Sequence, residues 1–188
     1  MITHLIKSIN WVDAGLLVLF VRMIFVGVKN GFLSEFFKAL GVVVAVFLSL
    51  HYYSYLSAWL TMKTGFAWGY WDLVICMAIW LVVAFFFKFL REGILILFKV
   101  ETNHEGFDKY AAGLVAVARG IMVASMVIFL ILLAHNNLVT RMTMRSYSFK
   151  IAGRASVMTY GFLYNNLVSK LFVGEHYNSA VPKVLHPQ

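Results

Sequence analysis

Residues 110–134 read YAAGLVAVARGIMVASMVIFLILLA, and this run decides the fold. It carries a single charged residue, Arg119, in twenty-five positions. A helix needs about 20 mostly apolar residues to cross the hydrocarbon core of a bilayer. A membrane strand is much shorter and alternates between apolar and polar residues, so a strand is excluded here. The run predicts a membrane-spanning helix.

Three further apolar runs have a similar length, at residues 11–28, 32–50 and 68–87. The linker between the first two spans only residues 29–31, which predicts a tight antiparallel hairpin. Hydrophobic residues make up 62% of the chain and the mean hydropathy is +0.82. Charged residues make up 13%, about half the usual share in soluble domains. We therefore predict an all-α integral membrane bundle of about four transmembrane helices with interfacial amphipathic helices.

Four spans place both termini on the same side of the membrane, which we call face A; the opposite side is face B. Tryptophan favours the headgroup level of a bilayer. Four of the five tryptophans fall at span ends on face A: Trp11, Trp59, Trp68 and Trp71. Lysine and arginine near the span ends number six on each face, so the positive-inside rule does not orient the protein. The net charge of +8 indicates contact with anionic lipid headgroups, not nucleic acid.

The chain divides into a four-span membrane domain, residues 1–140, and a basic amphipathic tail, residues 141–188. Residues 88–99 form either a helix on the surface of face B or an extension of the third span; their charged residues are Lys88, Arg91, Glu92 and Lys99. In the tail, one apolar helical face predicts a helix that lies on the membrane surface or docks on a partner; it comprises Ile151, Ala155, Met158 and Phe162. Residues from about Glu175 onward are predicted to be disordered.

Small residues recur at helical spacing in several spans. They are Ala112, Ala116, Gly120 and Ala124 in the fourth span with Gly113 beside them, Gly41 and Ala45 in the second, and Gly27 and Gly31 at the hairpin. Such stripes let two helix backbones approach closely in lipid. They predict either packing within one subunit, an oligomer seam, or a helix that lines a pore.

Ionisable residues inside the spans are candidates for function, because a charge is costly in lipid. Those toward face B are Arg22, Glu35, Lys38 and Arg119, and those toward face A are Asp13 and Asp72. They serve either structural pairing or conduction and coupling. We predict that Glu35 and Arg119 form a charge pair, with Arg22 as the rival partner of Glu35.

The motifs of soluble enzymes do not occur. The six histidines are isolated, without HExxH spacing, and no P-loop, GxGxxG or GxSxG motif occurs. Cys76 is the single cysteine, so the chain forms no internal disulfide. We expect neither catalysis nor a metal or other cofactor.

Several of these residues occur in a recognisable order. Asp13 opens the first span, Gly27-Val28-Lys29-Asn30-Gly31-Phe32 forms the hairpin, Glu35 follows, and His51-Tyr52-Tyr53-Ser54-Tyr55-Leu56 and the run from Asp108 to Gly120 complete the pattern. Over roughly residues 10 to 134 the chain resembles the colicin V production protein family (CvpA). That family typically reads Asp-Arg, then Gly at every fourth position, then Arg-Gly. Asp108, Lys109, Arg119 and Gly120 hold this frame, whereas Ala112 and Ala116 stand where glycine is usual.

The resemblance implies a bacterial inner-membrane protein needed for colicin V export, for envelope homeostasis and for resistance to membrane-active compounds. Some members of the family carry a periplasmic protease domain after the spans, which implies that face A is periplasmic. Two mechanisms follow as alternatives. The protein acts either as a channel- or transporter-like homo-oligomer, or as a non-conducting scaffold that organises envelope protein partners.

Overall fold

The computed structural model describes residues 11–66, 69–97, 106–134, 136–172 and 174–185. Within these ranges the chain is helical and contains no strand. Four helices are long and apolar enough to cross a membrane: α2 (Trp11–Asn30), α3 (Phe32–Thr64), α4 (Trp71–Leu97) and α5 (Gly106–Leu133). The predicted all-α class and the four predicted spans are confirmed.

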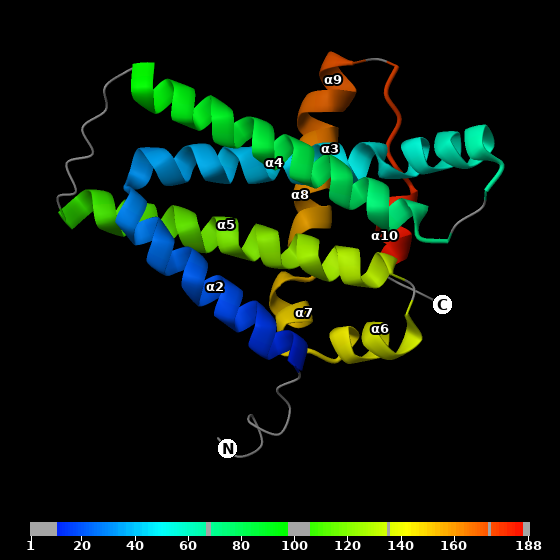
Figure 1. Ribbon diagram of the computed structural model, residues 1–188, viewed down its shortest axis with the longest axis horizontal. Helices are drawn as coiled ribbons and strands as arrows, with labels where there is room; N and C mark the ends of the chain where they lie inside the picture. The colour runs from blue at the N-terminus through cyan, green and yellow to red at the C-terminus, as the bar shows by residue number, and fades with distance from the viewer. Residues whose placement is uncertain (1–10, 67–68, 98–105, 135, 173, 186–188) are drawn as a thin grey trace.

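The two central helices of the bundle are α3 and α5, with α2 beside α5 and α4 beside α3 (Figure 1). A single residue, Gly31, separates α2 from α3. Its φ of 76° lies in the left-handed region, which glycine adopts at little cost because it has no Cβ. At the same end of the bundle, the Phe32 amide donates a hydrogen bond of 3.1 Å to Asp108 Oδ1, so the beginnings of α3 and α5 are tied together.

Two helices are longer than the sequence predicted. α3 continues beyond residue 50 to Thr64, where Gly65 ends it with a φ of 64°. Its 33 residues extend about 50 Å at 1.5 Å per residue, more than the ~30 Å hydrocarbon core. α4 runs without a break to Leu97, so the extension of the third span is the correct alternative for the described part of residues 88–99. Trp68, Phe98 and Lys99 lie outside the described residues.

The interior consists of two apolar clusters that share α5. One cluster joins α3, α4 and α5 through Leu50, Tyr53, Cys76, Met126 and Phe129. The other joins α2 and α5 to the tail, through residues that include Val12, Leu16, Ile128, Ala152 and Leu185. Because tail residues belong to both clusters, the tail is part of the folded core and not a separate appendage.

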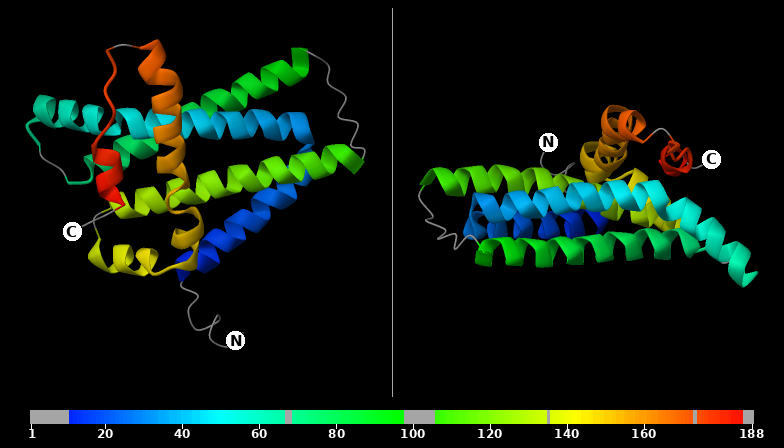
Figure 2. Two further views of the ribbon diagram at one scale, coloured as in Figure 1. Left: turned by 180° about the vertical axis from the view of Figure 1, so that it is seen from behind. Right: turned by 90° about the horizontal axis from the view of Figure 1, so that it is seen from above.

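The tail folds into α6 (Asn137–Met144), α7 (Tyr147–Ala152), α8 (Ala155–Leu163), a π-helical turn (Tyr164–Val168), α9 (Ser169–Leu171) and α10 (Ala180–Val184). α8 crosses α3 and α5 on one side of the bundle (Figures 1 and 2). Ser156 and Tyr160 are fully buried there, and Ser156 is hydrogen-bonded to Ser125 of α5 at 2.8 Å. The helix therefore docks on its own chain.

The apolar face predicted for the tail points away from this contact. Ile151, Met158 and Phe162 are each about two-thirds exposed, at 68%, 65% and 66%. The docking face is the opposite one, which carries small and hydroxylated side chains. The exposed face is thus free to contact lipid, as the amphipathic pattern predicts.

The prediction of disorder from Glu175 onward is wrong for residues 175–185. Val181 is fully buried, and Asn178 donates a hydrogen bond of 2.8 Å from its side chain to the Leu50 carbonyl. The segment is short and polar, which is why its sequence suggested disorder, yet its few apolar side chains fill the space beside α3 and α5. Residues 186–188 lie outside the described residues.

The small residues of α5 pack against α2 within the chain. A Cβ added at Gly27 would lie 2.3 Å from the Ala116 Cβ, and one added at Gly120 would lie 2.7 Å from the Phe20 ring. Gly113 faces Val28 in the same way, and Gly41 of α3 faces Phe87 of α4. The remaining members of the stripes are buried as well: Gly31, Ala45, Ala112 and Ala124. In one copy of the chain, these stripes serve helix packing inside the subunit.

We expect Gly120→Leu to destabilise the bundle, because the new side chain would collide with the Phe20 ring. Overpacking of this kind typically costs about 1–3 kcal/mol. The matched control is Gly15→Leu in α2, where an added Cβ meets nothing within 4 Å. The measurement is the Tm of the purified protein in detergent. A similar Tm for the two variants would show that α2 and α5 are not held at this contact.

Candidate functional site

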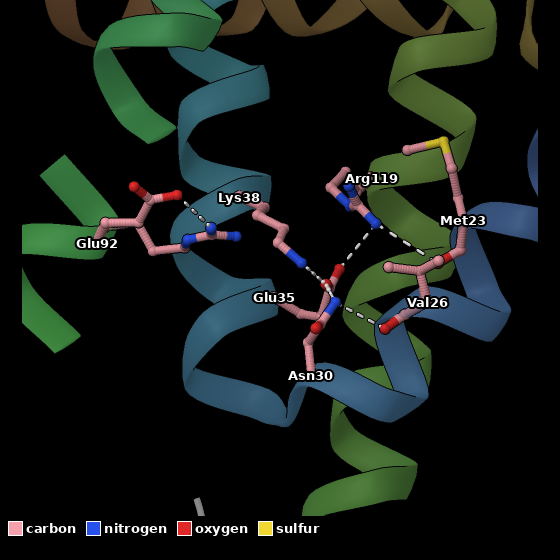
Figure 3. Close-up of polar contacts among 8 residues, drawn as sticks. Met23, Val26, Asn30, Glu35, Lys38, Glu92 and Arg119 are labelled. Atoms are coloured by element: carbon pink, nitrogen blue, oxygen red, sulfur yellow. Dashed lines mark hydrogen bonds and ion pairs between the residues drawn. The ribbon is translucent and has the colours of Figure 1, made fainter. Parts of the chain in front are cut away.

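The candidate site is a cluster of charged side chains at the hairpin end of the bundle. Glu35 lies in the first turn of α3 and its side chain is completely buried. Arg119 reaches it from α5, Lys38 from the next turn of α3, and Asn30 from the end of α2 (Figure 3). Three of the four spans therefore meet at one carboxylate.

Both oxygens of Glu35 face positive or donating groups. Oε2 forms an ion pair with an Arg119 Nη atom at 2.8 Å. Oε1 forms an ion pair with Lys38 Nζ and accepts a hydrogen bond of 3.3 Å from Asn30 Nδ2. The predicted charge pair between Glu35 and Arg119 is confirmed.

Because the Glu35 carboxylate is buried, its charge has to be compensated by neighbouring side chains. A carboxylate in an apolar interior is unstable unless cations and hydrogen-bond donors compensate it. Gly27 of α2 packs against it: a Cβ there would lie 3.4 Å from Glu35 Cδ, an ordinary van der Waals distance, and would collide with the Ala116 Cβ at 2.3 Å. Arg119 also contacts α2 through a long hydrogen bond of 3.5 Å to the Met23 carbonyl. The small residue at Gly27 and the charge at Glu35 thus belong to one packing unit.

The rival partner, Arg22, does not join this cluster. Its side chain is exposed on the outside of α2, and no described residue forms an ion pair or hydrogen bond with it. The sequence placed Arg22 and Arg119 at comparable depth, but only Arg119 lies on a helix face that looks toward α3.

The two acidic residues predicted near face A have different surroundings. Asp13 is buried and caps α7: its Oδ1 accepts hydrogen bonds from the Ser148 amide at 2.8 Å and the Ser148 hydroxyl at 2.7 Å, and its Oδ2 accepts one from the Tyr147 amide at 3.3 Å. Asp13 therefore fastens the tail to the first span. Asp72 is half-buried in the first turn of α4 and lies close enough to Tyr53 and Cys76 to interact with them electrostatically.

A second polar cluster was missed by the sequence analysis. His51 of α3 is buried; its Nδ1 lies 3.1 Å from the Tyr160 hydroxyl, and its Nε2 lies 3.0 Å from Glu175 Oε2. The Asn178 amide donates a hydrogen bond of 2.9 Å to the same Tyr160 hydroxyl. These partners lie more than a hundred residues from His51, so no local sequence pattern indicates them.

The electrostatics of this cluster favour a docked tail. The hydrogen bond from His51 holds the pKa of the Glu175 carboxyl below its ordinary value of 4.5. Burial raises the pKa of Tyr160 to about 12, so its hydroxyl keeps its proton at physiological pH. The cluster of His51, Tyr160 and Glu175 is a latch between the tail and α3.

Within the described residues, no group of three or more His, Cys, Asp or Glu side chains could hold a metal ion. What the hairpin cluster offers is a fixed set of charges in an apolar environment, able to hold helices together or to interact with a charged solute.

Comparison with known proteins gives one result. The family described as Colicin V production protein matches residues 12–157. This range includes all four spans and continues through α6 and α7 into α8, beyond residue 134, where the resemblance in the sequence ended. Comparison with curated proteins and with solved structures gave no match.

We expect Glu35→Gln and Arg119→Gln each to lower the free energy of unfolding by about 3–5 kcal/mol, because each leaves a buried charge without its partner. The double variant should lose less than the sum of the two, since the groups contact each other. Unfolding in detergent measures both effects. Glu92→Gln, at a side chain that is 46% exposed, is the control. Strictly additive losses would reject the direct pairing.

The latch predicts a pH dependence of tail docking. Because the pKa of Glu175 is lowered in the folded protein, the carboxylate stabilises docking above its ordinary value of 4.5 and loses this effect as the pH falls through the lowered value. The protection factors of the amides of residues 175–185, which correct for the intrinsic pH dependence of hydrogen exchange, should therefore fall on acidification across that range.

In Glu175→Gln the pH dependence of these protection factors should disappear, whereas Glu92→Gln should retain it. An unchanged pH profile in Glu175→Gln would contradict the latch.

Proposed function

Because this chain belongs to the colicin V production protein family, we propose that it supports colicin V export and envelope homeostasis as a channel- or transporter-like homo-oligomer in the bacterial inner membrane. The family and the four long apolar helices make it a membrane protein linked to colicin V production. Its partners in the proposal are the lipid bilayer, further copies of itself and envelope proteins. The proposal assigns it no catalytic activity and no contact with nucleic acid.

The observation that carries the proposal is the position of Arg22. It lies eleven residues after Trp11 and eight before Asn30 on α2, so roughly 16 Å and 12 Å from the two ends of the helix. This is the middle of the span. Its side chain is exposed, and no described residue pairs with it. A lipid-facing arginine at such a depth costs about 2.5–3.5 kcal/mol on insertion scales.

A second copy of the chain or a water-filled path would remove this cost. The side chains around Arg22 form an exposed apolar stripe on α2, comprising Leu17, Val18, Val21 and Phe25. In one copy of the chain this stripe faces lipid, with the arginine at its centre. The proposal therefore places α2 at the interface between copies, and Arg22 beside the path or beside an acceptor of the neighbouring copy.

The proposed orientation has face A in the periplasm. It is supported by the family resemblance, in which some members carry a periplasmic domain after the spans. In this orientation the docked tail and its latch face the periplasm, and the Glu35 cluster lies toward the cytoplasm.

The alternative function is a non-conducting scaffold for envelope proteins. One observation favours it: the small-residue face of α5 packs on α2 inside the chain, so this face is not available to line a path. In a scaffold, Arg22 would bind an acceptor on a partner protein and no solute would cross.

The test is Arg22→Leu, assayed for colicin V production in cells that lack the wild-type protein and for oligomer size after purification. Leucine removes the charge that the interface or path requires, so both production and assembly should fall while the folded chain persists in the membrane. Arg22→Lys keeps the charge and should retain most of the production.

A leucine variant with wild-type assembly and production would refute the role of Arg22, because lipid tolerates leucine better than arginine. Solute flux through the wild-type protein in liposomes separates the alternatives: flux supports the channel or transporter, and its absence supports the scaffold.

A further inference from the structure

A cavity of about 350 Å³ opens between α3, α4 and α5, next to the Glu35 cluster. Four cationic residues line it: Lys38, Lys88, Arg91 and Arg119. Its remaining walls are apolar and include Gly41 and Phe87. The contact between Gly41 and Phe87 brings α3 and α4 close together at this apolar wall. The cavity therefore has a basic part and an apolar part.

Among the described residues, the positive charges on the cavity wall outnumber the acidic groups near them. Glu35 is shared between Lys38 and Arg119. Glu92 lies 3.4 Å from Arg91 and is 46% exposed. Within the described ranges, four cations thus face two carboxylates, which leaves an excess of two positive charges. Lys38, Arg91 and Arg119 are close enough to repel one another, so the arrangement is unfavourable without a further anion.

Two buried donors on this wall find no acceptor in the part of the chain that the structure describes. The Nε atoms of Arg91 and Arg119 are buried, and no described residue accepts a hydrogen bond from either. A buried donor without an acceptor costs about 1–3 kcal/mol, and here the two donors belong to residues that line the same cavity. An anion with several oxygens would satisfy them and neutralise the excess charge.

The position of the cavity along the spans indicates which class of anion it can bind. Lys38 lies six residues after the start of α3, about 9 Å along the helix, and Lys88 and Arg91 lie within ten residues of the described end of α4 at Leu97. All are at the face-B end of the bundle, near headgroup depth. Arginine forks match the oxygens of phosphate, and basic pockets between transmembrane helices bind phosphorylated lipid headgroups.

We infer that this cavity binds a phosphate group, carried either by a lipid headgroup or by a soluble phosphate. Two of its cations also hold Glu35, whereas Lys88 and Arg91 come from α4 and are not in contact with that carboxylate. The anion would therefore join α4 to the cluster that already holds α2, α3 and α5. This site does not depend on the proposed function, because either a transporter or a scaffold could use it.

The test measures binding to the full chain in neutral detergent, from the rise in Tm on titration with phosphatidylglycerol, with inorganic phosphate and with phosphatidylcholine. Saturable stabilisation by phosphatidylglycerol but not by inorganic phosphate identifies a lipid headgroup as the source. Saturable stabilisation by inorganic phosphate identifies a soluble one. Phosphatidylcholine, whose phosphate is masked by a choline cation, should bind more weakly.

The double variant Lys88→Gln with Arg91→Gln should weaken the binding about tenfold or more, equivalent to about 1.4 kcal/mol. The matched control is Lys29→Gln with Lys63→Gln, which removes the same charge from two exposed lysines that do not line the cavity. Arg91→Lys keeps the charge and should retain most of the binding, which separates a lost site from a misfolded chain. An equal loss in both double variants, or no saturable binding of either phosphate source, would overturn the inference.

Discussion

The carboxylate of Glu35 constrains the whole bundle, because it is completely buried and has to be compensated from several sides at once. Arg119 has to enter from α5, Lys38 from the next turn of α3, and Asn30 from the end of α2. These contacts fix the hairpin end of the bundle in depth and in rotation, since each helix can meet the carboxylate only with one face. Apolar packing alone would not achieve this, because in lipid the outside of a helix is as apolar as its interior contacts. The small residues then act in support: Gly27 leaves room for Ala116 and lies beside the carboxylate.

The sequence predicted the parts of the fold that depend on local composition. The four spans follow from the length of the apolar runs, and the hairpin follows from the short linker at residues 29–31. The pair of Glu35 and Arg119 follows from helices that enter from the same face, with the long side chain of the deeper Arg119 reaching back toward Glu35. Depth, however, does not reveal rotation. Arg22 and Arg119 have comparable depth, and only the packed structure shows that one faces inward and the other outward. In the same way, periodicity identified an amphipathic tail helix but not its docking face, which uses Ser156 and Tyr160 instead of the more apolar side.

The missed features share one physical cause, which is that they join residues far apart in the chain. His51 has no metal-ligand spacing with the other histidines, so its sequence position indicates no role, yet it is buried against Tyr160 and Glu175. The segment after Glu175 is short and polar, so it gave no helical pattern, although Asn178 satisfies the Leu50 carbonyl and Val181 enters the core. Such contacts depend on a surface that exists only after the spans have assembled. A single sequence has no periodic signal for them.

The cap that Asp13 provides for α7 has a consequence for the order in which the protein is made. Asp13 belongs to the first of the four spans and is translated before its hydrogen-bond donors at Tyr147 and Ser148, which are about 134 residues further along the chain. During synthesis the first span therefore enters the membrane with a carboxylate that has no partner in the tail, and water or headgroups at the span end have to solvate it. This cap forms only after residues 147 and 148 have been translated. A product cut short before residue 147 would retain its spans without this fastening.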